Sequence, residues 1–368
     1  MNEESLKEFL NNNPQAIVDL REAAKLVPQR KYGRLSRALE KYADEIAGDE
    51  TDAISKDEKY WSVMPIATCI DNVCSHTLDH QEKESGIVGA PSGYMGLDRI
   101  MYGFQAGELI VVASPPSAGK TAFVTGMARN MAVDYHIPVA FFTTEMSAER
   151  LMARLLVSES GLPIEKIRGA KKMTQDDWSC MHAAVLDLGR APIFVDDTPG
   201  LPIYEFVVNA RDLVVRHHVK AIFVDGMQMM EGPARFREGR EQEVTAICRI
   251  LKNTAMELQI PIIVTSQINR NVDSRSSSAR PQLSDLRESG AIEQIADVVM
   301  FIHRPEFLSA TNDYGFPGET DLIMAKYRDG EAMDIKMRFL KSEVKFVDYN
   351  DSASYTESKI NTFIETEN

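Results

Sequence analysis

Short apolar runs alternate with longer amphipathic stretches through the middle of the chain. Such runs are typical of strands buried on both faces of a sheet. They lie at 108–113, 138–144, 192–196, 221–225, 261–266 and 298–302. Helical spacing of apolar positions predicts helices between them, at 122–132, 148–160, 176–188, 203–217 and 240–258. This alternation favours an α/β fold, in which helices flank a mainly parallel central sheet.

The pattern changes on either side of this central region. Residues 1–60 are polar and predict a small helical region, and 61–85 predict one further helix. Glycine and proline then end that helix, so the main domain is expected to span 86–348. Its last strands are shorter and predict an antiparallel extension, at 322–326, 335–340 and 344–346. The acidic tail, 349–368, is expected to be flexible.

Composition narrows the class of protein. The chain has 368 residues, of which 44% are hydrophobic and 26% charged, as expected for a soluble protein with one large domain and an appendage, or two domains. Its net charge of -14 argues against general polyanion binding, so any nucleic-acid site must be local. No apolar run approaches the roughly 18–20 residues that span a bilayer, and no signal-peptide pattern is present, so we expect a cytoplasmic protein. The cysteines fit neither a zinc site nor a disulfide framework: Cys69, Cys74, Cys180 and Cys248.

The stretch Ser-Pro-Pro-Ser-Ala-Gly-Lys-Thr at 114–121 follows a predicted strand and precedes a predicted helix. This is the layout of a P-loop, whose backbone N–H groups and helix N-terminus hold phosphate oxygens. Lys120 would reach the β- and γ-phosphates, and the Thr121 hydroxyl would ligate Mg²⁺. Ser114 replaces the first glycine of the general pattern, and the alternative is a chance Gly-Lys-Thr at a helix start. The expected nucleotide-binding residues are Ser117, Ala118, Gly119, Lys120, Thr121 and Ala122.

Polar side chains follow three of the predicted strands, where ligand crevices lie in parallel sheets. Glu145 is placed to activate a water, although a solvated or capping glutamate is the alternative. Asp225 is placed to hold Mg²⁺ with Thr121, and a turn aspartate is the alternative. Gln267 is placed to sense the γ-phosphate, and a polar loop residue is the alternative.

Two further aspartates and a serine have structural interpretations. Asp196 and Asp197 follow a strand and are expected to initiate a turn. Ser147 is expected to cap the helix that begins at residue 148.

Arginines gather in two stretches outside the predicted strands. Flexible basic loops beside an ATP site favour contact with a nucleic-acid backbone, and solvated surface arginines are the alternative. The residues are Arg235, Arg237, Arg240, Arg270, Arg275, Arg280 and Arg287. Alternation within a strand also places Lys326 and Arg328 on one face. They form a possible arginine finger and helper for a neighbouring subunit's ATP, or an ordinary exposed edge strand.

Seven segments, in this order, resemble the motor domain of DnaB-type replicative helicases, which are hexameric RecA-like ATPases. The resemblance runs from about 92 to 348 and includes the absence of the first P-loop glycine. The segments are SAGKTAF at 117–123, EMSAE at 145–149, DDTPGL at 196–201, VDGMQ at 224–228, SQINR at 266–270, SDLRESGAIEQ at 284–294 and KYR at 326–328.

The resemblance implies a RecA-like fold, use of ATP and Mg²⁺, and specific roles. Glu145 would be the catalytic base, Asp225 the acid that holds the metal, and Gln267 the γ-phosphate sensor. Lys326 and Arg328 would act on the next subunit's ATP. The DNA-contacting residues would be Arg287, Glu288 and Gly290, joined by Arg235, Arg237 and Arg270 from the basic loops. The helix within 61–85 would be the linker helix that docks on a neighbour.

The function implied is an ATP-dependent, ring-forming DNA helicase that translocates on single-stranded DNA and unwinds duplex during DNA replication. Its partners would be single-stranded and forked DNA, further copies of itself as a homohexamer, and a helicase loader or primase. Two features depart from the family: the short N-terminal region and Gly226, which stands where an aromatic residue is usual. The first favours a phage, plasmid or mobile-element origin in a bacterial host. The alternatives are a filament-forming RecA-like recombination or annealing ATPase, and a regulatory ATP-binding subunit, against which Glu145 argues.

Overall fold

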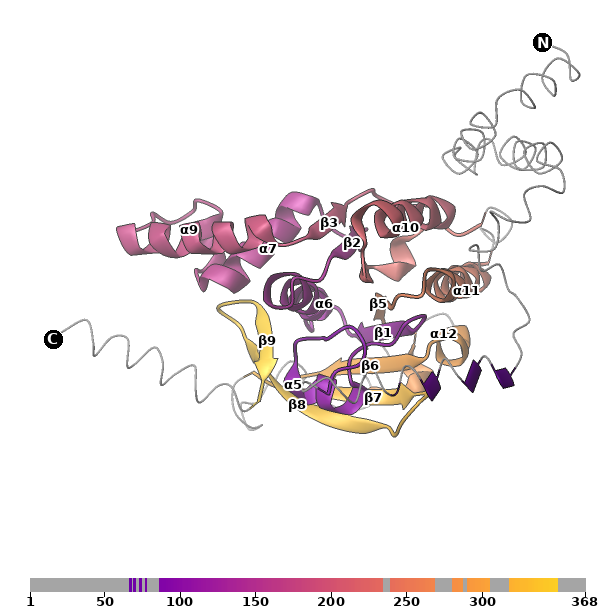
Figure 1. The fold of residues 1–368 in the computed structure, drawn as a ribbon. Helices are drawn as coiled ribbons and strands as arrows, with labels where there is room; N and C mark the ends of the chain where they lie inside the picture. The colour runs from indigo at the N-terminus through magenta and orange to yellow at the C-terminus, as the bar shows by residue number, and fades with distance from the viewer. Residues whose placement is uncertain are drawn as a thin grey trace, which may run out of the picture. The chain divides into compact units, whose positions relative to one another are not determined.

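A mixed sheet of nine strands runs through the part of the chain that the structure, a computed structural model, describes (Figure 1). That part comprises 86–233, 239–268, 280–286, 290–304 and 318–349, together with residues 66, 67, 69, 70, 73, 74 and 77, which are helical. The helical region predicted at 1–60, most of the helix predicted within 61–85 and nearly all of the tail lie outside the described residues. The sheet and its helices belong to one compact unit, except for Tyr204–Asn209 within the helix Ile203–His217. The residues described between 66 and 77 are also outside this unit.

The strand order is β3-β2-β4-β5-β1-β6-β7-β8-β9. The first six strands are parallel: β1 (Leu109–Ser114), β2 (Val139–Thr143), β3 (Ile193–Asp196), β4 (Ala221–Asp225), β5 (Ile262–Gln267) and β6 (Val298–His303). The last three are antiparallel: β7 (Glu319–Tyr327), β8 (Met333–Leu340) and β9 (Lys345–Asp348). The expected α/β class and antiparallel extension are therefore confirmed. Strand β7 starts three residues before the predicted position, because its pairing with β8 begins at Glu319.

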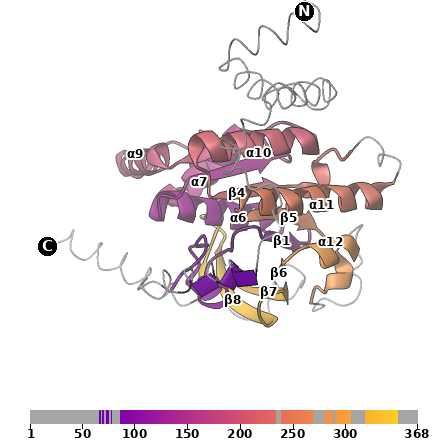
Figure 2. The ribbon, with the colours of Figure 1, turned by 45° about the vertical axis from the view of Figure 1, so that its right-hand side comes forward.

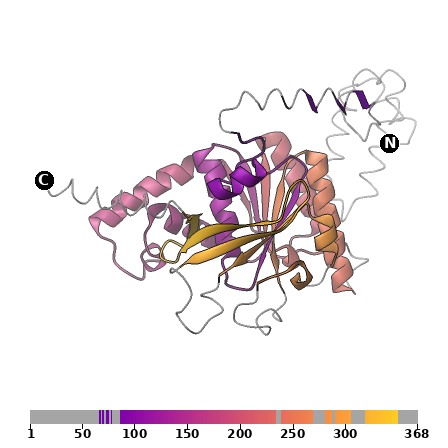
Figure 3. The same cartoon turned by 90° about the horizontal axis from the view of Figure 1, so that it is seen from below.

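Helices cover the two faces of the sheet (Figure 3). One layer contains α6 (Lys120–Arg129), α7 (Ala148–Ser160) and α9 (Gln175–Arg190), and the short helix α8 (Ile164–Ile167) joins α7 to α9. The other contains α11 (Arg240–Leu258) and α12 (Gly290–Ile295), and α10 (Ile203–His217) connects β3 to β4. Right-handed crossovers explain this division, because the chain moves one way along the sheet after β1 and the other way after β3. Figure 2 shows α12 beside one end of β6 and β7.

The N-terminal half of the main domain departs from the prediction in two places. Helix α6 begins at Lys120, two residues early, and continues as a π-helix at Asn130–Asp134. A short helix, α5 (Met95–Met101), occupies the apolar segment before β1, and the side chain of Asp348 on β9 accepts hydrogen bonds from the N–H groups of Met95 and Gly96.

Aromatic side chains pack β9 against the start of α6. Phe123 stacks on Tyr94 with ring centroids 5.1 Å apart and meets Phe346 of β9 edge-on at 5.5 Å. A Cβ added to Gly119 would lie 2.9 Å from the Phe346 ring. Since Gly119 also has a φ of 111°, both its backbone and its surroundings require glycine. The antiparallel extension therefore supports the P-loop directly.

No described helix has the length and apolar character needed to cross a bilayer. All four cysteines are described, and each is a free thiol.

Candidate functional site

The carboxyl ends of four parallel strands meet at one edge of the sheet. Ser114 at the end of β1 pairs with Gln267 at the end of β5, and Thr143 at the end of β2 pairs with Asp225 at the end of β4. The P-loop, Glu145, Asp225 and Gln267 are therefore neighbours, as parallel topology requires. Their roles remain predictions.

The P-loop backbone accepts hydrogen bonds from the side chain of its own lysine. Lys120 is buried, and its Nζ donates to the carbonyl oxygens of Ser114 at 3.1 Å and Pro115 at 3.2 Å. Burial lowers the pKa of Lys120, while the carboxylates of Glu145 and Asp225 oppose that shift. Ser117 adopts a positive φ of 65°, which helps the loop to turn around the lysine. The loop leads into the N-terminus of α6, where free N–H groups and the helix dipole favour phosphate.

Asp225 lies at the bottom of the site with 1% exposure. Its Oδ1 accepts a hydrogen bond from the Thr265 hydroxyl at 2.8 Å, whereas its Oδ2 has no hydrogen-bond partner among the described residues. Burial raises the pKa of Asp225, and the nearby hydroxyls of Thr121 and Thr265 lower it. A buried carboxylate oxygen without a partner, beside a threonine hydroxyl, is a donor set that suits Mg²⁺. The residues present therefore fit the expected metal.

Glu145 and Gln267 touch each other across the strand ends. Gln267 Nε2 donates to Glu145 Oε1 at 3.4 Å. The backbone N–H of Gln267 donates to Gln228 Oε1 at 3.4 Å, and Gln228 Nε2 donates to the Ser266 hydroxyl at 2.6 Å. The expected base and the expected sensor are thus linked to the segment that follows β4.

Lys326 and Arg328 lie at the opposite edge of the sheet. Tyr327, between them, pairs with Val298, the first residue of β6, and Arg328 N–H donates to the Asp297 carbonyl at 3.0 Å. Asp297 N–H in turn donates to the carbonyl of Leu109, where β1 begins. The P-loop follows the other end of β1, which is six residues long, so about 17 Å of strand separates the two places.

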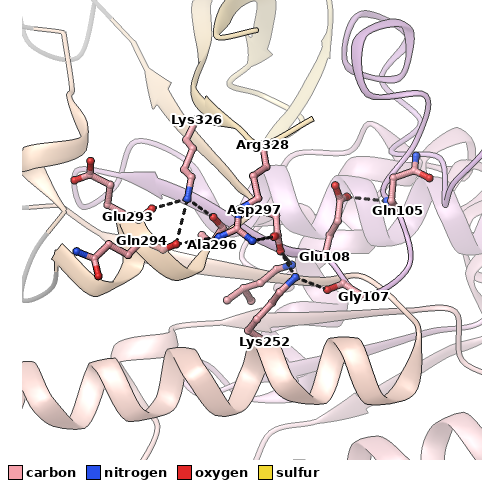
Figure 4. A network of polar contacts seen from close by, with 11 residues as sticks. Gln105, Gly107, Glu108, Lys252, Glu293, Gln294, Ala296, Asp297, Lys326 and Arg328 are labelled. Atoms are coloured by element: carbon pink, nitrogen blue, oxygen red, sulfur yellow. Dashed lines mark hydrogen bonds and ion pairs between the residues drawn. The ribbon is translucent and has the colours of Figure 1, made fainter. Parts of the chain in front are cut away.

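Both cations are engaged with the C-terminal end of α12 (Figure 4). Lys326 Nζ donates to the carbonyls of Glu293 at 2.6 Å, Ala296 at 2.6 Å and Gln294 at 3.4 Å. Arg328 forms an ion pair with Asp297 at 2.8 Å and donates to the Gln294 carbonyl at 3.1 Å. Partial burial, together with the charge of Arg328, lowers the pKa of Lys326.

Comparison with known proteins identifies the family. The family model for the DnaB-like helicase C terminal domain matches residues 89–348. The chain belongs to this family. Replicative DNA helicase DnaC of Bacillus subtilis is 37% identical over 282 residues, which are 76% of this chain and 61% of that protein. The match thus spans about three-fifths of that relative's length.

Solved structures agree with the DnaB-like assignment. One solved ATPase domain superposes with a TM-score of 0.72 at 29% identity, covering 78% of this chain and 99% of that one. A DnaB-like replicative helicase, solved in a study of its interactions with primase, superposes with a TM-score of 0.69 at 25% identity, covering 94% and 78%. The RecA-like architecture expected from the resemblance is confirmed.

The DnaB-like motif residues expected to contact DNA are mostly outside the described residues. Six of them are outside the described part of the chain: Arg235, Arg237, Arg270, Arg275, Arg287 and Glu288. Gly290 is described and begins α12. Two other expected loop arginines are described and paired with carboxylates. Arg240 contacts Glu243 at 2.7 Å, and Arg280 contacts Asp334 at 2.5 Å.

Of the two aspartates at the end of β3, Asp196 has the expected role in the turn, whereas Asp197 has a different structural role. Asp196 Oδ1 accepts from Thr198 N–H at 3.0 Å within the turn. Asp197 Oδ2 accepts from Ala148 N–H at 2.9 Å and so caps α7. Ser147 is the N-cap residue of this helix, as expected, although its side chain makes no capping hydrogen bond.

The sequence analysis did not single out Thr265 and Thr144, and it noted Gly226 without a role in the DnaB-like site. Thr265 accepts from Gly226 N–H at 2.7 Å while donating to Asp225. The Thr144 hydroxyl lies within 3.0 Å of the Asp225 and Gly226 carbonyls. Gly226 has a φ of 97°, and a Cβ there would lie 2.7 Å from Glu145 Cγ. The signals in the sequence were a threonine near the end of two of the apolar strands, at 144 and 265, and the glycine that directly follows Asp225.

Proposed function

We propose that this chain is an ATP-dependent, ring-forming DNA helicase that translocates on single-stranded DNA and unwinds duplex during DNA replication. One observation carries the proposal: the P-loop cluster and the cations Lys326 and Arg328 occupy opposite edges of a single sheet. A chain arranged in this way holds two halves of an ATP site that cannot meet within one subunit. A ring of like copies joins each P-loop to a neighbour's cations, because a head-to-tail interface repeats until it closes.

ATP would bind with its phosphates on the P-loop. Lys120 exchanges its contacts with the Ser114 and Pro115 carbonyls for phosphate oxygens, whose negative charge opposes the lowering of its pKa by burial. Thr121 and Asp225 would hold Mg²⁺, which supplies neutralisation of the phosphate charge. Glu145 orients a water and accepts its proton, and Gln267, which contacts Glu145, lies where the γ-phosphate is lost.

Single-stranded DNA would pass through the ring. The acidic chain has no general affinity for DNA, so binding falls to local basic segments repeated around the pore. These are the segments that contain Arg287, Glu288 and Gly290, with Arg235, Arg237 and Arg270. A solved relative was studied with primase, and we propose a primase or a helicase loader as a further partner of this chain.

The direct test is strand displacement from a forked duplex with ATP and Mg²⁺, comparing the unmodified chain with Arg328→Ala. The proposal expects unwinding by the first and none by the second, and a hexamer-sized species for both by mass photometry. Long helical filaments on DNA would favour the recombinase-like alternative. DNA-stimulated ATP hydrolysis without any unwinding would favour the regulatory one.

A further inference from the structure

Asp297 is the point at which the finger residues meet the rest of the fold. It is 5% exposed, and both of its carboxylate oxygens are used (Figure 4). Oδ1 pairs with Arg328 at 2.8 Å. Oδ2 accepts from Leu109 N–H at 2.8 Å and from Lys252 Nζ at 2.6 Å. The carboxylate is therefore bonded to β1 and α11 independently of its contact with the arginine.

We propose that Asp297 is a positioning residue, which fixes the direction in which Arg328 is presented to the nucleotide of the neighbouring subunit. This inference rests on the proposed function, since it concerns the arginine that would complete a shared ATP site. Asp297 would thus act in hydrolysis although it is buried and lies at the opposite end of β1 from the P-loop of its own chain.

The geometry of the guanidinium supports this role. Arg328 is half exposed, and a long side chain at such a position samples many rotamers unless something holds it. A guanidinium is a rigid plane with five N–H donors. NH1 is held by Asp297 and NH2 by the Gln294 carbonyl, so two contacts fix the plane and leave three donors for phosphate oxygens.

The charge balance also suits presentation of a cation. Lys252 forms an ion pair with the other carboxylate oxygen of Asp297. The negative charge of Asp297 is therefore shared between two cations and does not fully neutralise Arg328. Lys326 differs from Arg328 in this respect. Its three N–H donors match the three carbonyls that it contacts at the end of α12, which leaves no donor for a ligand in this conformation. Arg328 is thus the cation that the fold presents, and Lys326 secures the helix beside it.

The test uses Asp297→Asn, which keeps the shape of the side chain but removes its charge. Steady-state ATP hydrolysis is measured on the full chain with Mg²⁺ and an oligo-dT strand. We expect kcat to fall about tenfold with an unchanged KM for ATP, because the P-loop lies at the other edge of the sheet. When Asp297→Asn is combined with Arg328→Ala, kcat should be no lower than in Arg328→Ala alone, because the effects of residues that act as a unit are not additive.

A control variant separates positioning from folding. Asp177→Asn breaks the ion pair with Lys166, far from Arg328 in the chain. It should lower the melting temperature while keeping kcat within about twofold of the unmodified chain. A kcat loss in Asp177→Asn that equals the loss in Asp297→Asn would overturn the inference, and so would additive effects or a normal kcat in Asp297→Asn. Unchanged turnover in Arg328→Ala alone would instead refute the shared ATP site of the proposed function.

Discussion

Gln267 Nε2 donates to Glu145 Oε1 over 3.4 Å, so the side chain that ends β5 touches the one that follows β2. Gln267, the expected γ-phosphate sensor, therefore contacts Glu145, the expected base, directly. A change at the phosphate that moves Gln267 would therefore also alter Glu145, the proposed base.

The role of Glu145 is tested by Glu145→Gln, which preserves the contact with Gln267 but cannot accept a proton. We expect kcat for ATP hydrolysis to fall by about 10²–10⁴, the usual contribution of general-base catalysis. Nucleotide affinity, measured by fluorescence titration, should change little. Glu149→Gln, an exposed acid in the first turn of α7, serves as the matched control and should hydrolyse ATP normally. Normal turnover in Glu145→Gln would remove the base from this position.

Gly226 provides a second test, because a side chain at this position would meet Glu145. Gly226→Ala places a Cβ 2.6 Å from Thr144 Oγ1 and 2.7 Å from Glu145 Cγ, at a residue with a φ of 97°. We expect kcat to fall as Glu145 is displaced, and the free energy of unfolding to fall by about 1–2 kcal/mol from the backbone alone.

Gly161→Ala isolates the backbone cost of that substitution. Gly161 also has a positive φ, of 66°, but a Cβ there meets nothing within 4 Å. Gly226→Ala should lose at least as much stability as Gly161→Ala in urea unfolding, because its Cβ also meets Thr144 and Glu145, and only Gly226→Ala should lose turnover. Equal turnover in both would mean that Gly226 has no influence on the base.

Glu108 predicts a pH dependence of stability. Burial raises its pKa from 4.5 to about 7, and Asp297 and Asp329 add to the shift. Because the folded-state pKa is the higher one, the neutral form is favoured in the folded protein. The resulting stabilisation is full below about pH 4.5 and is lost as the pH rises through 7.

Glu108→Gln mimics the neutral form at every pH and keeps an acceptor for Gln105 N–H. By this linkage it should exceed the unmodified chain in unfolding free energy by about 1–3 kcal/mol at pH 8, and by little at pH 5. Urea unfolding at both values measures the difference. A gap of the same size at pH 5 and pH 8 would show that the pKa of Glu108 is not raised.

Much of the fold follows from local patterns in the sequence. Helices α7, α10 and α11 and strand β4 begin and end where the apolar pattern places them, because each is long or uniformly buried. The short helices α8 and α12 carry too few residues for a periodic signal. The P-loop cluster was predictable because parallel strands bring their carboxyl ends to one edge.

Other features of the site depend on contacts between residues far apart in the chain. Thr265 bonds Asp225 across 40 positions, and Asp297 bonds Leu109 across 188. No local pattern records such partners. The motif residues alone also gave no sign that Lys326 would contact the end of α12, which depends on the register of β6 and β7.

If each ATP site is completed by a neighbouring subunit, two variants that are inactive alone should restore hydrolysis when they are mixed. Lys120→Ala lacks a working P-loop but keeps Arg328, and Arg328→Ala has the reverse defect. In rings assembled from equal amounts, about a quarter of the interfaces unite an intact P-loop with an intact Arg328. We expect ATP hydrolysis to recover to about that fraction of the unmodified rate. Hydrolysis no greater than that of the two variants measured separately would contradict it.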